Sequence, residues 1–303
     1  MKERGQMSFG DIFQNLISGI SIGCTYGIIG LGVVFLWQSI ERINFANISS
    51  AMLSAYLFYS CYTSLQLGFW GAFILSIAAV AVYGLLLRHL IYEPIARSGG
   101  GKLEFVVATL MLSVLWLTVI ISTYGGLPKA FPPVFGTASD LLTIGDIRLP
   151  RYYLYIFSVV LTLMVFLHLL LHKSLIGKIM RACAQNVTAA QLMGINVNRI
   201  TSLAFMLATS VVGIGGILLA PVYFVSLELG GGTIGIKGFA AAVMGGLMDP
   251  YGTLLGGIVI GILENFSTLF ISSTYKDVIS FTVLIAVLIG NPNGIFNWSG
   301  KRS

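Results

Sequence analysis

The segment IFQNLISGISIGCTYGIIGLGVVFLW (Ile12–Trp37) contains no charged side chain. About 20 consecutive, mainly apolar residues are enough for a helix to cross the hydrocarbon core of a bilayer. This segment exceeds that length, and further long apolar runs follow it along the chain. It therefore predicts a first transmembrane helix and, together with the later runs, a protein that crosses a membrane several times.

The composition of the whole chain agrees with a membrane protein. Hydrophobic residues make up 56% of the 303 residues, charged residues make up 9%, and the mean hydropathy is +0.92. Soluble domains carry about 25% charged residues. A transmembrane β-barrel has segments of alternating hydrophobicity about ten residues long, whereas the runs here are long and unbroken. We expect an all-α polytopic membrane protein with about 8–9 transmembrane helices, forming one permease-like domain over residues 1–303.

Apolar runs predict eight spans, near residues 12–37, 45–64, 69–91, 104–124, 152–172, 198–220, 252–272 and 276–290. A shorter apolar run lies at 238–248, inside the stretch GFAAAVMGGLMDPYG. A helix rises about 1.5 Å per residue, so this run is too short to cross a core of about 30 Å alone. Its glycines favour a broken helix, which is tolerated in a membrane where it is buried in protein or lines a cavity.

Basic residues between the spans predict the orientation of the chain. The loop 88–102 contains three arginine or lysine residues and one glutamate, and the loop 173–199 contains four and no acid. Short loops rich in lysine and arginine stay in the cytoplasm. We therefore expect both loops inside the cell, and the loop 125–151 and the N-terminus outside. Lys301 and Arg302 favour an inner C-terminus, which requires the short run to count as a crossing.

Motifs for catalysis, metal binding or nucleotide binding are absent from the sequence. The three histidines and three cysteines do not have the spacing of a metal site or a catalytic pair. The stretch SGGGKLE (Ser98–Glu104) resembles the end of a phosphate-binding loop, but that motif requires glycine and serine or threonine where Ala96 and Leu103 stand. We expect no enzyme activity, no metal and no cofactor bound by this chain.

Polar side chains within the predicted spans are candidates for function, because such groups are costly in lipid. Glu264 lies in the middle of a span, where it either bonds a neighbouring helix or lines a solute pathway. Glu228, in SLELGGGTIGIKG, is expected at the outer surface, as a solvated charge or a docking residue. The candidate pathway residues are Thr25, Tyr26, Asn44, Asn47, Glu264 and Asn265.

Small residues recur at helical spacing in the first span. Gly19, Gly23 and Gly27 are four residues apart, and the pairs Gly252/Gly256 and Gly257/Gly261 repeat that spacing. Such stripes allow helix backbones to approach closely in a membrane. We expect packing within the subunit, with contacts between subunits or sliding helices as alternatives.

One long segment, GKIMRACAQNVTAAQLMGINVNRI (Gly177–Ile200), is polar. Ile179, Cys183, Val187 and Ala190 follow one another at i, i+4, i+8 and i+11, which is an apolar stripe of helical period. Gly194 supplies a helix stop. The pattern predicts a single amphipathic cytoplasmic helix over 178–194, which is either an interfacial connector or a docking element.

The stretch TAAQLMG (Thr188–Gly194) favours docking, because its small residues let a partner approach the helix. Its spacing is similar to the Glu-Ala-Ala-x3-Gly motif with which membrane subunits of ABC importers dock onto their ATPase subunits. Ala189, Ala190 and Gly194 match that motif, while Thr188 stands in place of the glutamate. The downstream Ile-x-Leu-Pro part is missing, with Ala204 in place of the isoleucine.

Other stretches occur in the order and spacing of one family. They are INFAN (Ile43–Asn47), YEP (Tyr92–Pro94), RACAQNVTAAQLMGIN (Arg181–Asn196), KGFAAAVMGGLMDPYGTLLGG (Lys237–Gly257) and YKDVISF (Tyr275–Phe281). Along nearly its whole length the chain resembles the LivH-like permeases of branched-chain amino-acid ABC transporters.

This resemblance implies a multi-pass subunit of the bacterial inner membrane that imports a small solute by alternating access. Its partners would be a second, LivM-like permease, two cytoplasmic ATPases that bind ATP and Mg²⁺, and a periplasmic solute-binding protein that docks on the loop 125–151 and near Glu228. Family substrates are leucine, isoleucine and valine, and relatives carry urea, short amides and aromatic acids. The residues to which the resemblance gives a role in ATPase coupling are Arg181, Asn186, Thr188, Ala189, Ala190, Met193 and Gly194.

The sequence departs from the family at the start of the second predicted span. The family often continues INFA with His-Gly-Glu, whereas Asn47, Ile48 and Ser49 follow here. If this segment contacts solute, the specificity has shifted from that of the usual members. The alternative function is a stand-alone secondary transporter or channel. Against it stand the TAAQLMG segment and the lack of paired acids within the spans.

Overall fold

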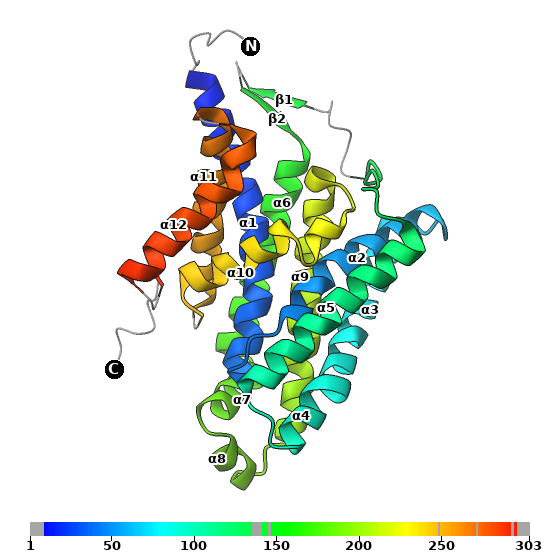
Figure 1. The fold of residues 1–303 in the computed structure, drawn as a ribbon, viewed down its shortest axis with the longest axis vertical. Coiled ribbons are helices and arrows are strands. Elements are labelled where there is room, and N and C mark those ends of the chain that lie inside the picture. The colour runs from blue at the N-terminus through cyan, green and yellow to red at the C-terminus, as the bar shows by residue number, and fades with distance from the viewer. Residues whose placement is uncertain are drawn as a thin grey trace.

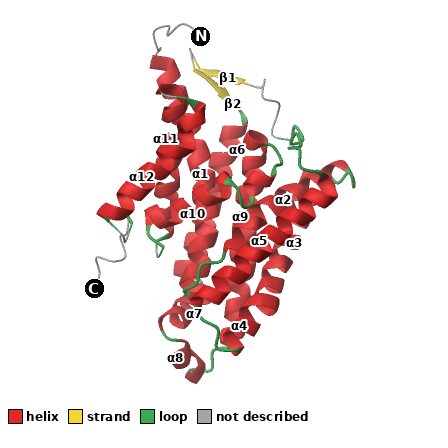
Figure 2. Cartoon of the chain, in the orientation of Figure 1, coloured by secondary structure: helices red, strands yellow, loops and turns green. Residues whose placement is uncertain are grey.

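The structure is a computed structural model that describes residues 9–134, 141–144, 147–247, 249–270, 272–291 and 294–295. Within these ranges the chain is almost entirely helical, with one two-stranded hairpin (Figures 1 and 2). The long helices are α1 (Phe9–Ile40), α2 (Phe45–Thr63), α3 (Phe69–Leu87), α5 (Lys102–Tyr124), α6 (Tyr152–His168), α9 (Val197–Tyr223), α11 (Pro250–Phe270) and α12 (Lys276–Gly290). The shorter elements are α4 (Glu93–Arg97), α7 (Leu175–Gln185), α8 (Val187–Leu192), α10 (Thr233–Gly245), β1 (Leu141–Ile144) and β2 (Ile147–Pro150).

In the part of the chain that the structure describes, seven helical segments are long and apolar enough to cross a membrane: Ile12–Ile40, Phe69–Arg97, Lys102–Tyr124, Tyr152–Leu171, Val197–Tyr223, Pro250–Phe270 and Ser273–Gly290. Helix α2 has 19 residues but is more polar, and α10 has 13 residues. At about 1.5 Å per residue α10 is about 20 Å long, which is too short to cross the core. The expected polytopic helical fold is confirmed, whereas the expected count of 8–9 transmembrane helices is only approximate, because α2 and α10 lie outside these seven segments.

Helix α1 forms the centre of the bundle. In the most apolar stretch of α1, 94% of the residues are buried by the rest of the chain. The corresponding share is only 17% for α5 and 6% for the segment Ser273–Gly290, which contains α12. Helix α1 packs against α9, α10 and α11 (Figure 1). The faces of α5 and α12 are therefore left for lipid or for another subunit.

Glycines bring α1 and α11 into backbone contact. A Cβ atom at Gly23 would lie 2.6 Å from the carbonyl oxygen of Gly257 and 2.6 Å from the Cα of Ile258. A Cβ atom at Gly261 would lie 2.5 Å from the Cα of Gly23. These distances leave no room for a side chain, so the prediction of close packing within the subunit is confirmed.

The two basic loops share one end of the molecule. Helix α4 lies there with α7 and α8, and the β1–β2 hairpin lies at the opposite end (Figure 1). The sequence did not predict this antiparallel hairpin, in which Leu141 pairs with Pro150, inside the loop 125–151. A backbone bridge between Lys129 and Val225 ties this loop to the segment that follows α9. Lys301 and Arg302, on which the expected inner C-terminus depends, lie outside the described residues.

Candidate functional site

Four ionisable side chains gather where α10, α11 and α12 meet. The Nζ atom of Lys237 lies 2.8 Å from Oε1 of Glu264 and 2.6 Å from Oδ1 of Asp277. The Nζ atom of Lys276 lies 3.2 Å from the same oxygen of Glu264. We call these four residues the ion cluster. Its two positive and two negative charges cancel, which matters because Lys237 is only 1% exposed and an unpaired buried charge is costly.

Two tyrosine hydroxyls also donate hydrogen bonds to the carboxylate of Glu264. The Tyr26 hydroxyl donates to Oε2 of Glu264 at 2.7 Å, and the Tyr223 hydroxyl donates to Oε1 at 3.1 Å. The Lys237 ammonium lies 5.6 Å from the centre of the Tyr26 ring, and the Lys276 ammonium lies 5.4 Å from that of Tyr223. Both distances suit cation–π attraction. The cluster therefore joins α1 and α9 to the three helices that carry the charges.

The other predicted pathway residues make local contacts. Thr25 donates to the carbonyl of Ile22 at 2.6 Å, and Asn265 donates to the carbonyl of Gly261 at 3.0 Å. Each of these bonds satisfies the side chain within its own helix. Thr25 and Asn265 therefore do not take part in the hydrogen bonds around Glu264.

Asn44 and Asn47 lie at the start of α2. The side-chain oxygen of Asn44 accepts from the backbone N–H of Asn47 at 3.1 Å, which caps the helix. Asn47 is fully buried, and within the described part of the chain neither atom of its amide group has a hydrogen-bond partner. Gly32 lies against it, since a Cβ atom there would be 3.3 Å from Nδ2 of Asn47. The six predicted pathway residues thus fall into separate groups.

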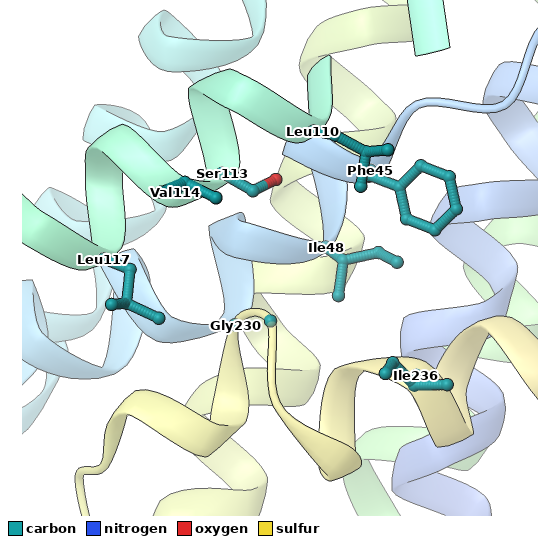
Figure 3. Close-up of a pocket in the computed structure, with 9 residues that line it drawn as sticks. Phe45, Ile48, Leu110, Ser113, Val114, Leu117, Gly230 and Ile236 are labelled. Carbon is teal, nitrogen blue, oxygen red and sulfur yellow. The ribbon is translucent and has the colours of Figure 1, made fainter. Parts of the chain in front are cut away.

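A groove of about 200 Å³, open on one side, lies between α2, α5 and the glycine-rich segment that leads into α10 (Figure 3), and Val114 on its wall is 58% exposed. We call it the side-chain pocket. Its walls are apolar and come from Phe45, Ile48, Leu110, Val114, Leu117 and Ile236. The Ser49 hydroxyl donates to the carbonyl of Gly230 at 3.2 Å, which holds the glycine-rich segment against α2.

The polar segment forms two helices rather than the single helix predicted over 178–194. Helix α7 ends at Gln185 and α8 begins at Val187, because Asn186 between them is extended, with φ −156° and ψ 104°. The Asn186 side-chain oxygen accepts from the N–H of Ala189 at 2.9 Å. Asparagine is a preferred N-cap, and this local bond overrides a weak apolar stripe.

The break at Asn186 redirects the apolar side chains of the segment. Cys183 and Ala190 face the protein as predicted, but Val187 is exposed. Leu192 and Met193 are 84% and 82% exposed. We call Val187, Leu192 and Met193 the coupling surface. Large apolar side chains left exposed on and beside one short helix are candidates for contact with a partner protein.

The remaining coupling candidates lie on the same two helices. Arg181, Thr188 and Ala189 are exposed. Gly194 has a φ of +79°, and this left-handed conformation ends α8 as the sequence predicted. Burial raises the pKa of the Cys183 thiol, which makes this thiol less reactive than an exposed one.

The segment that follows Gly194 is tied to the π-helical turn Arg88–Tyr92, which continues from the end of α3. The buried guanidinium of Arg88 donates to the side-chain oxygen of Asn198 at 3.1 Å and pairs with Glu93 at 3.2 Å. Asn196 caps α9 by accepting from the N–H of Arg199 at 3.1 Å. These contacts connect the chain after α8 to the membrane-crossing segments Phe69–Arg97 and Val197–Tyr223.

Comparison with known proteins identifies the family. Residues 15–288 match the model of the branched-chain amino acid transport system / permease component family. The chain belongs to this family. The permease is 30% identical over 296 residues to the high-affinity branched-chain amino acid transport system permease protein BraD of Pseudomonas aeruginosa, covering 93% of this chain and 94% of BraD. It is 29% identical over 300 residues to the corresponding LivH of Salmonella typhi, with coverage of 93% and 94%.

Among solved structures, the permease is similar to PsaBC from Streptococcus pneumoniae in complex with Fab, with a TM-score of 0.48 and 13% identity over 96% of this chain and 95% of that chain. Family membership confirms the resemblance seen in the sequence. The permease is a multi-pass membrane transport subunit and not an enzyme.

Within the ranges that the structure describes, no three His, Cys, Asp or Glu side chains gather as metal ligands.

Sequence reasoning missed four members of the network around Glu264: Tyr223, Lys237, Lys276 and Asp277. Lys237 was the detectable one, because it is a lone lysine beside the short apolar run. The apolar run begins at residue 238 and leaves Lys237 just outside the predicted helix. In the structure α10 begins at Thr233, so Lys237 lies within the helix and is buried. Glu264 is therefore not a lone intramembrane acid in this permease.

Glu228 lies on the short 3-10 turn Leu227–Leu229, just before α10. Its side chain is exposed, as the sequence predicted. A solvated charge and a docking residue both fit this position.

Proposed function

We propose that this permease is the membrane subunit of an ATP-driven importer that carries branched-chain amino acids, or a related amino acid, amide or organic acid, across the bacterial inner membrane. The observation that carries the proposal is the coupling surface. It presents large apolar side chains at the end of the molecule where the basic loops lie. Its relatives are named as permeases of high-affinity branched-chain amino acid transport systems, which supports the solute class.

The proposed partners account for the uncovered faces of the molecule. A second, LivM-like permease would cover the sparsely buried faces of α5 and α12. Two cytoplasmic ATPases, which bind ATP and Mg²⁺, would contact the coupling surface. A periplasmic solute-binding protein would approach the opposite end, where the hairpin lies, and Glu228, in the chain that joins α9 to α10, is its candidate docking residue. This chain itself binds no cofactor in the proposed cycle.

In this proposal the permease contributes a path and a mechanical connection. Closure of the ATPases on ATP moves α7 and α8, and the turn at Gly194 passes the movement to α9. The bond between Arg88 and Asn198 extends it to the membrane-crossing segment Phe69–Arg97. Coupling requires that the ATPases bind the inward-facing and outward-facing states with different free energies.

Reconstitution tests the proposal directly. In vesicles that contain both permeases and the ATPases, leucine uptake is expected to require ATP and the solute-binding protein. Vesicles with this chain alone are expected to show no uptake on an ion gradient. Uptake by the single chain, driven by such a gradient, would instead support a stand-alone secondary transporter.

Glu228→Lys is expected to weaken docking of the solute-binding protein. Charges at the rim of an interface mainly change association rates, so the concentration of binding protein needed for half-maximal uptake should rise severalfold at an unchanged maximal rate. The matched control is Glu104→Lys, which changes an exposed glutamate at the opposite end, in the first turn of α5. An equal response of both variants would assign Glu228 to solvated surface charge.

A further inference from the structure

The side-chain pocket combines an apolar wall with irregular backbone. Leu110, Val114 and Leu117 line it from α5, one helical turn apart, and Phe45 and Ile48 line it from the start of α2 (Figure 3). The third wall is the chain around Gly230 and Gly231, which leads into α10. Three separate parts of the sequence therefore face one space.

The non-helical wall around Gly230 and Gly231 indicates whether the pocket faces water or lipid. Non-helical backbone at membrane depth is found where it is buried in protein or lines a water-filled cavity, because lipid cannot satisfy its polar groups. A Cβ atom at Gly231 would meet no atom within 4 Å, so this residue faces open space. Gly231 is also exposed. An exposed, irregular backbone fits the wall of an aqueous pathway and not a surface covered by lipid chains.

The pocket has the size and polarity for an aliphatic side chain. An apolar protein cavity of about 150 Å³ holds a benzene molecule, so about 200 Å³ accommodates a branched four-carbon group. Among the described residues that line it, Ser113 alone has a polar side-chain atom, and its hydroxyl donates to the carbonyl of Thr109 at 3.0 Å. A charged or strongly polar group would lose its water here without gaining a side-chain donor in exchange.

We propose that the side-chain pocket holds the aliphatic side chain of the solute during its passage, and that Val114 and Leu110 thereby set selectivity within the permease. This inference rests on the proposed function as an amino-acid importer. It assigns the permease its own selection step, after the choice made by the solute-binding protein. It places that step at α5, whose outer face the chain leaves uncovered.

Filling the pocket by one carbon tests the proposal. Val114→Leu should lower the ratio of leucine uptake to valine uptake about tenfold, since one methylene in an apolar pocket changes discrimination by about 10-fold to 200-fold. Uptake is measured with the complete transporter in vesicles and one solute-binding protein. The preference of that binding protein cancels when the variant ratio is divided by the wild-type ratio.

The chain offers a matched control and a reversal. Val119→Leu makes the same substitution on α5, but Val119 lines a different groove, beside α3. It should leave the ratio unchanged. Leu110→Val lies one turn before Val114 on the same wall, so adding it to Val114→Leu should restore the ratio.

Each outcome decides between explanations. An unchanged ratio in Val114→Leu, with ATP-dependent uptake by the wild type, overturns the pocket inference and leaves the proposed function standing. An equal loss of both solutes also overturns it, because a partner helix or a lipid chain would then occupy the pocket. If the wild-type transporter takes up neither solute with ATP, the proposed function itself fails for this solute class.

Discussion

Glu264→Gln is expected to destabilise the permease by roughly 3–5 kcal/mol, the usual cost of leaving a buried charge without its partner. The substitution removes one negative charge and leaves Lys237 and Lys276 with Asp277 alone. Lys237→Met should cost a similar amount by creating the opposite imbalance. Because folded domains are stable by only about 5–15 kcal/mol, each loss should lower both the amount of folded protein and uptake. Unfolding of the purified permease in detergent micelles measures the effect.

The double variant separates a structural role from a role in the pathway. Lys237→Met with Glu264→Gln removes one charge of each sign, so the cluster stays neutral and the destabilisation should be smaller than the sum of the two single effects. Uptake should recover with stability. The control Asn265→Ala removes a bond within α11 and should cost about 1 kcal/mol. A double variant that is stable but inactive would show that the pair Lys237–Glu264 has a role in transport beyond stability.

The membrane-crossing helices could be predicted because their length is fixed by the bilayer. The run predicted at 104–124 is α5 (Lys102–Tyr124), and the run at 198–220 is α9 (Val197–Tyr223). The role of the glycine stripe in the first span could also be predicted, because a glycine such as Gly23 in a membrane helix lets the backbone of a second helix approach closely. These features depend on residues that are near one another in the sequence.

The ion cluster and the break between α7 and α8 could not be predicted in the same way. Tyr26 and Glu264 are 238 positions apart, and a single sequence does not show which helices are neighbours. At Asn186 two local preferences compete, an apolar stripe that favours one helix and a capping amide that favours two. The stripe is weak and the cap is satisfied by a hydrogen bond of 2.9 Å, so the cap prevails.

Leu192→Asp and Met193→Asp are expected to disconnect the ATPase subunits from the permease. Both side chains are more than four-fifths exposed, at 84% and 82%, so the permease alone should fold normally with either change. Central apolar residues of an interface each contribute about 2 kcal/mol or more when they anchor a partner, which corresponds to about a 30-fold weaker complex for each substitution. Co-purification of the ATPases with the permease measures binding, and solute-stimulated ATP hydrolysis measures coupling.

A matched variant at the other end of the molecule makes this prediction specific. Leu127 is 82% exposed, in the loop between α5 and the hairpin, so Leu127→Asp changes the same chemistry far from the coupling surface. It should leave ATPase binding intact. Thr188→Glu restores the acid that the ABC-importer motif carries and should strengthen docking if charge contributes to it. If Leu192→Asp and Met193→Asp keep the ATPases bound while Thr188→Glu changes their affinity, contact is made through the polar side of α8 and not through its apolar end.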